Sequence, residues 1–166
     1  MSHTKINLRP WRAKDLTAIV NRAGENGSAW TVNQFELSLA SGDLGWVLEI
    51  DNDQCSSNFD RLGAGLEIMG FLLVKPCLDF YDLLDIFIAS QYRGQGLAGR
   101  LLNSMILHAQ QHNIPRILLE VRCSNQIAAN LYTKHGFKII SYRRDYYPVS
   151  TNGREDGLVM EWNCIP

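Results

Sequence analysis

The stretch QYRGQGLAGRLL, residues 91–102, places three glycines and an alanine at the beginning of a leucine-rich helical pattern. Glycine is a poor helix former, but it adopts positive φ angles and lets a ligand approach the backbone closely. The first turn of a helix presents unpaired N–H groups and the positive end of the helix dipole, and both favour an anion. The stretch is therefore either a plain turn between a strand and a helix or a phosphate-binding loop.

Two common nucleotide-binding signatures do not fit this stretch. It lacks the Lys-Ser/Thr pair of a P-loop, and its spacing is not that of a GxGxxG motif after a first strand. The formal net charge of -1 gives the chain no global attraction to nucleic acid or to an acidic membrane. Any anion must therefore be held by a local site.

Glu120 places a carboxylate within the apolar run ILLEV, residues 117–121. A carboxylate in a dry interior is costly, so Glu120 either faces a wet cleft or lies on the outer face of a strand, paired with Arg122 or a neighbour. Tyr132 follows Asn125 by seven positions, which puts both on one face of a helix. By its pattern alone Tyr132 is a core residue with a polar tip.

Histidines and cysteines give no sign of a metal site or a disulfide. His108 and His112 have a spacing compatible with zinc, but the glutamate of HExxH is absent and no third ligand is evident, so we predict no metal. The four cysteines contain no CxxC pair, and the start MSHTKINLRPWR is polar and basic. We expect reduced thiols, no signal peptide and a cytoplasmic location. No apolar run is long enough to span a bilayer.

Hydrophobic periodicity predicts the elements that position these residues. Strands are expected at residues 6–11, 44–50, 66–74, 81–89, 116–121, 137–144 and 155–162. Helices are expected at residues 16–23, 32–40, 97–112 and 124–135, with Asp15 at the start of the first, Thr31 and Asn125 as caps and Gly136 as a terminator. The polar segment 51–65 suits a long hairpin connection, and residues 145–154 have turn chemistry.

This order predicts one α/β domain over residues 1–166, with a mixed sheet of about seven strands and helices on both faces. The strands at 81–89 and 116–121 are joined by a helix, so they should be parallel with a right-handed crossover. That arrangement places the start of the helix and the carboxyl ends of both strands along one edge of the sheet. In open α/β sheets, ligands bind at this edge.

Gln91, Gly94 and Gly96 resemble the Gln/Arg-x-x-Gly-x-Gly/Ala acyl-coenzyme-A motif of the GCN5-related N-acetyltransferase (GNAT) family. The blocks LEVRCSN, LYTKHGF, RRDYYP and EDGLVM resemble, in order and spacing, those of the RimI-type ribosomal-protein-alanine N-acetyltransferases within it. The resemblance implies a mostly antiparallel seven-stranded sheet, with an acyl-CoA cleft between two splayed central parallel strands. It also implies acetyl-CoA as cosubstrate.

The resemblance assigns cofactor contacts and catalytic roles. Backbone groups near the glycines would hold the pyrophosphate, and the strand before them would bond the pantetheine arm. The cap of the helix at residues 124–135 would also contact that arm. These residues are Arg93, Gly94, Gln95, Gly96, Leu97, Ala98 and Gly99, then Ile86, Phe87 and Ile88, and finally Asn125. Glu120 would be the general base and Tyr132 the general acid of a direct transfer, so Cys123 is not needed as a nucleophile.

The resemblance also implies an acceptor site. AWTVNQF partly matches the family's Pro-Trp-Ser loop through Trp30, and Tyr146 and Tyr147 would lie over the acceptor's first residues. Glu155 and Asp156 would attract a cationic amino terminus. Phe87 stands where many relatives have a small residue, so it either narrows the acetyl end of the cleft or points into the core.

The leading hypothesis is acetylation of a protein's N-terminal α-amine, most plausibly the alanine of ribosomal protein bS18. The alternatives are a GNAT enzyme that acetylates a small-molecule amine or a lysine, and a non-catalytic acyl-CoA-binding interaction module. The expected partner is a small-subunit ribosomal protein, with no direct contact to nucleic acid or membrane. The chain is expected to be a monomer or a weak dimer.

Overall fold

A computed structural model of the chain describes residues 6–24, 30–51, 66–149 and 153–164. The expected hairpin connection at 51–65 lies almost wholly outside these residues, as do Cys55 and residues 25–29. Within the described ranges, no helix is long and apolar enough to cross a membrane.

The observed elements follow the predicted order. The strands are β1 (Ile6–Pro10), β2 (Leu44–Asp51), β3 (Leu66–Pro76), β4 (Tyr81–Ile88), β5 (Arg116–Arg122), β6 (Lys138–Val149) and β7 (Gly153–Asn163). The helices are α1 (Leu16–Gly24), α2 (Val32–Ala40), α3 (Leu97–Gln111) and α4 (Gln126–Lys134), and two short 3-10 helices are η1 (Ala13–Asp15) and η2 (Ser90–Tyr92). Local capping and periodicity signals were therefore sufficient to predict the order of the strands and α-helices.

The seven strands form one sheet in the order β1-β2-β3-β4-β5-β7-β6. Antiparallel pairing joins β1 to β2, β2 to β3, β5 to β7 and β6 to β7. β4 pairs with β5 in parallel, over Tyr81–Leu83 and Ile117–Leu119. The mixed α/β class, the mostly antiparallel sheet and the parallel pair are thus confirmed, whereas the splay of the two strands stays a prediction.

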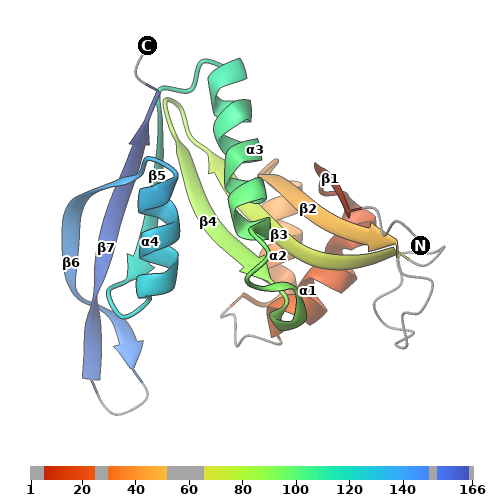
Figure 1. Cartoon of the computed structure of the whole chain (residues 1–166), viewed down its shortest axis with the longest axis horizontal. Coiled ribbons are helices and arrows are strands. Elements are labelled where there is room, and N and C mark those ends of the chain that lie inside the picture. The colour runs from red at the N-terminus through yellow and green to blue at the C-terminus, as the bar shows by residue number, and fades with distance from the viewer. Residues whose placement is uncertain (1–5, 25–29, 52–65, 150–152, 165–166) are drawn as a thin grey trace. The chain divides into compact units, whose positions relative to one another are not determined.

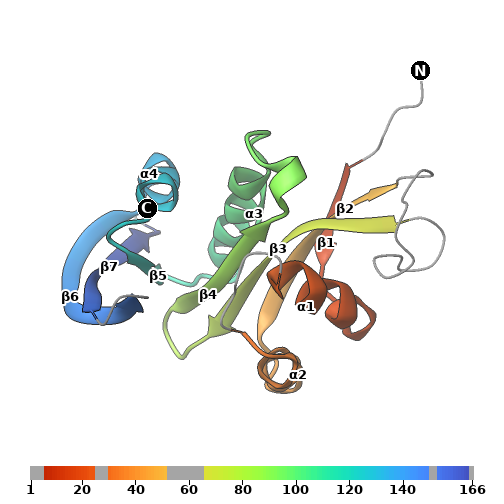
Figure 2. The same ribbon diagram turned by 90° about the horizontal axis from the view of Figure 1, so that it is seen from below.

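The chain forms two compact units, and β4 and α3 each have residues in both. The first unit comprises Met1–Lys75 and Leu84–Ser104, and the second comprises Pro76–Leu83 and Met105–Pro166. In the first unit, α1 and α2 lie on one side of the strands and the beginning of α3 lies on the other (Figure 2). Its core contains Ile19 and a series of aromatic rings, in which Phe35 contacts Phe71 and Phe71 stacks on Phe87.

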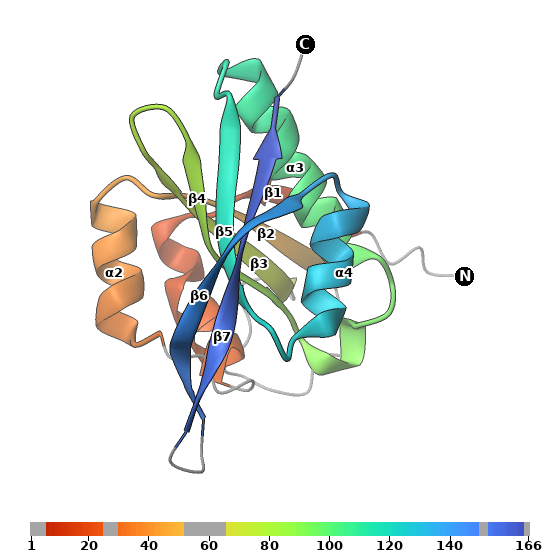
Figure 3. The same ribbon diagram turned by 90° about the vertical axis from the view of Figure 1, so that its left-hand side faces the viewer.

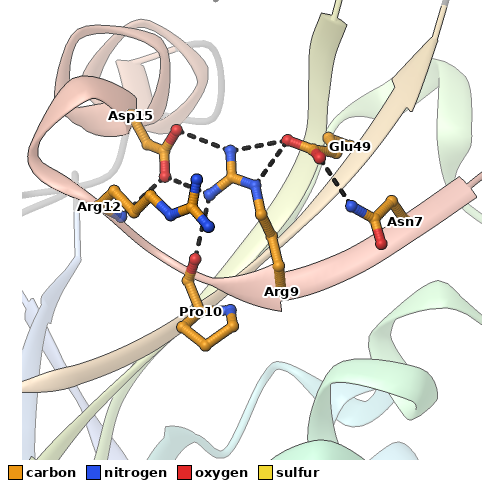
Figure 4. Close-up of polar contacts among 6 residues, drawn as sticks. All are labelled: Asn7, Arg9, Pro10, Arg12, Asp15 and Glu49. Atoms are coloured by element: carbon orange, nitrogen blue, oxygen red, sulfur yellow. Dashed lines mark hydrogen bonds and ion pairs between the residues drawn. The ribbon is translucent and has the colours of Figure 1, made fainter.

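Thr31 caps α2 as predicted, because its side chain accepts a hydrogen bond from the Gln34 amide. Asp15 has a different role from the expected one. Its carboxylate accepts from the Arg12 amide at 2.8 Å and closes η1, and it also binds the guanidinium of Arg9 (Figure 4). The 3-10 turn before α1, which the sequence did not predict, is therefore held by a buried carboxylate.

Arg9 also binds Glu49 of β2, so one guanidinium lies between two buried carboxylates (Figure 4). Burial opposes the ionisation of Glu49, but hydrogen bonds from Arg9 and Asn7 outweigh it and lower the pKa of Glu49 below its usual value. Glu49 thus remains ionised in the interior. This cluster links β1, β2 and η1.

In the second unit, β5, β7 and β6 run side by side, and α4 lies on one face of them (Figures 1 and 3). Along β5, buried residues alternate with partly exposed ones, as expected for a strand with a single core face. Asn125 caps α4, and Gly136 follows it with a φ of +91°. Both predicted ends of this helix are confirmed.

Of the turn expected at residues 145–154, residues 145–149 and 153–154 lie in strands instead, and residues 150–152 lie outside the described residues. β6 continues to Val149 and β7 begins at Gly153, with Tyr147 paired to Glu155 and Pro148 paired to Arg154. β6 ends the strand order, and an edge strand tolerates a proline because one row of its N–H groups has no ladder partner. The register shifts between Arg143 and Tyr147, where Asp145 has a φ of +49°. The first residues of the stretch therefore form a bulge around Asp145 within β6.

Candidate active site

The glycine stretch connects η2 to α3 in the first unit. Gly94 and Gly96 have φ angles of +75° and +74°, which side-chain-bearing residues rarely adopt. A Cβ atom built on either glycine meets nothing within 4 Å. Open space beside a backbone that requires glycine is suited to close approach by a ligand. This observation favours a binding loop over a plain turn.

Backbone amides at the beginning of α3 are oriented for an anion. The helix starts at Leu97, and the amide of Arg100 donates to the Gly96 carbonyl at 3.2 Å. Leu97, Ala98 and Gly99 precede Arg100 and form the first turn of the helix. In this turn the N–H groups of an α-helix have no intrahelical partners. The Leu97 side chain is buried in the core, so only its backbone is suited to ligand binding.

The strand before the loop offers its main chain rather than its side chains. Phe87 is 5% exposed and stacks on Phe71 with ring centroids 5.5 Å apart, so of the two alternatives for Phe87 the core position is correct. Ile88 is also buried, and its carbonyl accepts from Nε of Arg93 at 2.9 Å. Arg93 thus ties the loop back to the end of β4.

Glu120 lies on the partly exposed face of β5, where its carboxylate forms an ion pair of 2.7 Å with Nη2 of Arg143 on β6. The side chain of Glu120 is 27% exposed. The sequence suggested Arg122 or a neighbour as its partner, but Arg122 binds Glu155 and the carbonyl of Pro148 instead. Glu120 is therefore a solvent-accessible carboxylate held by an arginine of the adjacent hairpin.

Tyr132 is 6% exposed on α4, and its ring lies 5.8 Å from that of Phe137. The same helix is capped by Asn125, whose Oδ1 accepts from the Ala128 amide at 3.2 Å. Tyr132 is thus the core residue with a polar tip that the pattern predicted. Its role as an acid, and a contact of Asn125 with a cofactor, stay predictions.

Two tyrosines and two arginines form a cluster near Glu120. The rings of Tyr146 and Tyr147 are nearly perpendicular at 4.9 Å, with Arg143 over Tyr146 at 4.8 Å and Arg122 over Tyr147 at 4.6 Å. Burial raises the pKa of Tyr147, and the charge of Glu120 raises it further, so this phenol stays neutral at physiological pH. We define these four side chains as the tyrosine–arginine cluster.

Sequence reasoning considered Arg122 only as a partner of Glu120, and it did not single out Arg143. Gly157 of β7 pairs with Arg122 on one side and with Arg143 on the other, which aligns the three strands. A Cβ at Gly157 would lie 3.1 Å from the ring of Tyr147, so the glycine leaves room for the tyrosine. The arginines could be recognised only from the strand register.

The carboxylates expected to attract an amino terminus have partners within the second unit. Glu155 accepts from Arg122 at 2.7 Å and from the Ser124 amide at 3.2 Å. Hydrogen bonds from Ser124 and then Arg122 lower the pKa of Glu155. Asp156 accepts from the Asp145 amide at 2.9 Å. These bonds stabilise the hairpin and the start of α4, and a direct role in acceptor binding stays a prediction.

Trp30, the remaining predicted acceptor residue, belongs to the first unit. It comes just before the cap of α2, and its ring lies 5.0 Å from that of Phe35. The half-buried ring thus packs on the core of its own unit. Its contact with an acceptor also stays a prediction.

His108 and His112 stack at 4.0 Å, and Nδ1 of His108 is hydrogen-bonded to the Tyr81 hydroxyl at 3.0 Å. Among the described residues, no group of three or more potential ligand side chains could hold a metal ion. Within the described part of the chain, Cys77, Cys123 and Cys164 form no disulfide. Partial burial, together with Asp156 and Glu155, raises the pKa of Cys123, which disfavours it as a nucleophile.

Residues 22–137 match the family model described as the acetyltransferase (GNAT) family. This match covers more than half of the chain, and the protein belongs to the GNAT family of acetyltransferases. The glycine loop and the mixed sheet are consistent with this assignment. The Arabidopsis thaliana NAA60 structure in complex with acetyl-CoA has the same fold, with a TM-score of 0.80 at 16% identity over 96% of this chain and 99% of that one.

Within the family, the chain is similar to proteins named [ribosomal protein bS18]-alanine N-acetyltransferase. The Escherichia coli K12 enzyme is 36% identical over 103 residues, which are 62% of this chain and 68% of that protein. The Haemophilus ducreyi enzyme is 36% identical over 93 residues, 56% of this chain and 64% of its own length. The crystal structure of the Escherichia coli ribosomal-protein-S18-alanine enzyme has a TM-score of 0.80 and 27% identity, over 96% of this chain and 94% of that one.

Proposed function

We propose that this chain transfers the acetyl group of acetyl-CoA to the N-terminal α-amine of a protein, and that the alanine of ribosomal protein bS18 is the acceptor. The observation that carries the proposal is Glu120, an accessible carboxylate held by Arg143 beside the tyrosines of β6. The likeness to the bS18-alanine N-acetyltransferases supports the choice of acceptor. We assign this activity to a single N-acetyltransferase domain over residues 1–166.

The glycine loop binds the pyrophosphate of acetyl-CoA. Gly94 and Gly96 leave open space beside the backbone, and the amides at the beginning of α3 neutralise the phosphate charge. The pantetheine arm bonds to the main chain of β4 at Ile86–Ile88. The residues assigned to the cofactor are those backbone groups, together with Arg93–Gly99 and Asn125.

The acceptor amine must lose a proton before it attacks, since an amine is mostly protonated at neutral pH. Glu120 accepts this proton, directly or through water. The amine nitrogen then forms a bond to the thioester carbonyl carbon and the carbon–sulfur bond breaks. Tyr132 donates its proton to the departing thiolate, and the resulting phenolate takes the second proton of the acylated nitrogen. The products are the N-acetylated chain and CoA, and Glu120 releases the first proton to solvent. The enzyme is not acylated at any step.

The tyrosine–arginine cluster binds the first residues of the acceptor. Tyr146 and Tyr147 offer flat rings and hydroxyls to a peptide backbone. Trp30 is assigned to acceptor binding on its resemblance to the family's loop alone. Glu155 and Asp156 attract the cationic amino terminus and also hold the hairpin in shape. Through its ion pair with Arg122, Glu155 both stabilises the hairpin and keeps its carboxylate in place for the amino terminus.

A thiol-release assay with a panel of amines tests this proposal. The protein is given acetyl-CoA with a peptide that has the alanine start of bS18, the same peptide with a blocked α-amine and an added lysine, or a polyamine. We expect CoA release with the free-amine peptide only. Release with the blocked peptide or the polyamine alone would contradict the assignment of the acceptor, and binding of acetyl-CoA without any release would support the non-catalytic alternative.

A further inference from the structure

Two residues of β3, Glu67 and Met69, anchor the segment that leads into the glycine loop. The carbonyl of Met69 accepts from the Ala89 amide at 2.9 Å, which fixes the end of β4. Two residues earlier, Oε1 of Glu67 accepts from Nε2 of Gln91 at 3.4 Å. Gln91 is the first residue of the Gln-x-x-Gly-x-Gly motif. A buried strand thus contacts the loop through one backbone bond and one side-chain bond.

Glu67 is itself fixed by a buried arginine of α1. Nη2 of Arg22 lies 2.6 Å from Oε1 of Glu67, and the two side chains are 7% and 6% exposed. Nε of Arg22 also donates to the carbonyl of Ile68 at 3.2 Å. A carboxylate so placed has little freedom to move, because leaving it unpaired in the interior would be costly. Glu67 therefore presents a fixed acceptor to Gln91.

The path from Gln91 to the phosphate-binding backbone is short and rigid. Gln91 lies in η2, where the Tyr92 amide donates to the Ala89 carbonyl at 2.9 Å and the Arg93 amide donates to Ser90 at 3.3 Å. Gly94, with its positive φ, follows three residues after Gln91. A change in the orientation of η2 must therefore move the amides that face the ligand.

We infer that Glu67, held by Arg22, is a positioning residue that sets the pyrophosphate-binding loop through Gln91. The inference rests on the proposed use of acetyl-CoA, and it assigns a function to a buried ion pair that the chemistry does not otherwise use. The ligand concerned is the pyrophosphate part of the donor rather than its acyl part. Glu67 and Arg22 act on binding, not on the transfer step.

The chain contains a matched control for this pair. Glu49 of β2 is also 6% exposed and forms a 2.7 Å ion pair with Arg9, but its contacts in Figure 4 lead to β1 and η1 rather than to the loop. Glu67→Asp and Glu49→Asp each retain the charge and shorten the side chain by one methylene. In Glu67→Asp the carboxylate moves back by about 1.5 Å, which is enough to break its hydrogen bond with Gln91, already 3.4 Å long.

The two variants are compared by steady-state kinetics with acetyl-CoA and with S-acetylpantetheine, which lacks the pyrophosphate. We expect Glu67→Asp to raise KM for acetyl-CoA about fivefold, as the loss of one hydrogen bond would, with kcat unchanged. KM for S-acetylpantetheine should stay the same, and Glu49→Asp should change neither. An equal rise in KM for both donors, or no rise for either, would overturn the inference.

The dependence on Gln91 is tested by a double-mutant cycle. Gln91→Met removes the amide at an exposed residue and leaves the Arg22–Glu67 pair intact, so it stays informative even if Glu67→Asp folds poorly. We expect it to raise KM for acetyl-CoA selectively, and Glu67→Asp should add nothing to it. If the fold-changes in KM of the two single variants multiply in the double variant, Glu67 does not act through Gln91.

Calorimetry of CoA binding separates this inference from the proposed function. If the unchanged protein fails to bind CoA, the proposed function is contradicted, and the inference with it. If the unchanged protein binds CoA and Glu67→Asp binds it equally well, only the inference is overturned. The expected result is binding by both, about fivefold weaker for Glu67→Asp, since one loop hydrogen bond is lost.

Discussion

The carboxylate of Glu120 on β5 lies 2.7 Å from Nη2 of Arg143 on β6, across the intervening strand β7. The ion pair orients a carboxylate that the sequence alone could place either in a cleft or on an outer face. Because Arg143 also lies over the ring of Tyr146, the same contact links the proposed base to the proposed acceptor site.

Glu120→Gln should abolish most of the transfer activity. The amide keeps the size of the side chain but cannot accept the amine proton, so we expect kcat to fall by about 100-fold or more, with little change in KM for acetyl-CoA. Steady-state kinetics with the alanine-start peptide measures this. Glu161→Gln removes a carboxylate of β7 near Arg116 and serves as the control, with activity retained. Normal turnover by Glu120→Gln would exclude Glu120 as the base.

Tyr132→Phe should lower kcat by about 10- to 100-fold, because the departing thiolate loses its proton donor. The ring remains against Phe137, so the unfolding free energy should change by no more than about 1.5 kcal/mol. Tyr81→Phe is the control, since Tyr81 is also buried and its hydroxyl binds His108. We expect the control to lose stability without losing kcat. Equal kcat values for the two variants would contradict the role of Tyr132.

Gly96→Ala should weaken donor binding as well as destabilise the fold. A residue with a Cβ at a φ of +74° is strained by about 1 kcal/mol, and the methyl group occupies the space beside the loop. Gly42→Ala is the matched control, because Gly42 has a φ of +80° and also meets nothing within 4 Å. The melting temperature should fall by a similar amount in both variants, but only Gly96→Ala should raise KM for acetyl-CoA. The same KM in both variants would argue against a binding loop.

The hydrogen bonds of Glu155 should make stability dependent on pH. Bonds from Ser124 and Arg122 lower the pKa of Glu155 in the folded state below its ordinary value of 4.5. The stabilisation is therefore complete above this ordinary value and is lost as the pH falls through the lower folded value. Urea unfolding of the unchanged protein and of Glu155→Gln should differ most near neutral pH and converge in acid. A difference that grows in acid would contradict this assignment.

Local signals in the sequence predicted most of the fold. Thr31 and Asn125 cap their helices and Gly136 follows the last one, because capping depends on residues only a few positions apart. The extension of β6 through Pro148 was missed. Its proline and the nearby asparagine and glycine are turn formers locally, whereas the place of β6 at the sheet edge depends on the whole strand order.

The candidate site was predictable where the chemistry lies in one segment. The glycine loop and α3 are contiguous, so the pattern alone raised the possibility of a phosphate site. Arg143 was not predictable as the partner of Glu120, because the two residues meet only through the register that places Gly157 opposite both Arg122 and Arg143. The core position of Phe87 likewise depended on its stacking with Phe71, which is distant in sequence.

The most direct test of the proposed reaction is mass spectrometry of the alanine-start peptide of bS18 after incubation with the protein and acetyl-CoA. The proposal predicts a single added acetyl group, located by fragmentation on the α-nitrogen of the first residue and absent when that amine is blocked. An acetyl group located on a lysine, or an unmodified peptide in the presence of bound CoA, would contradict it.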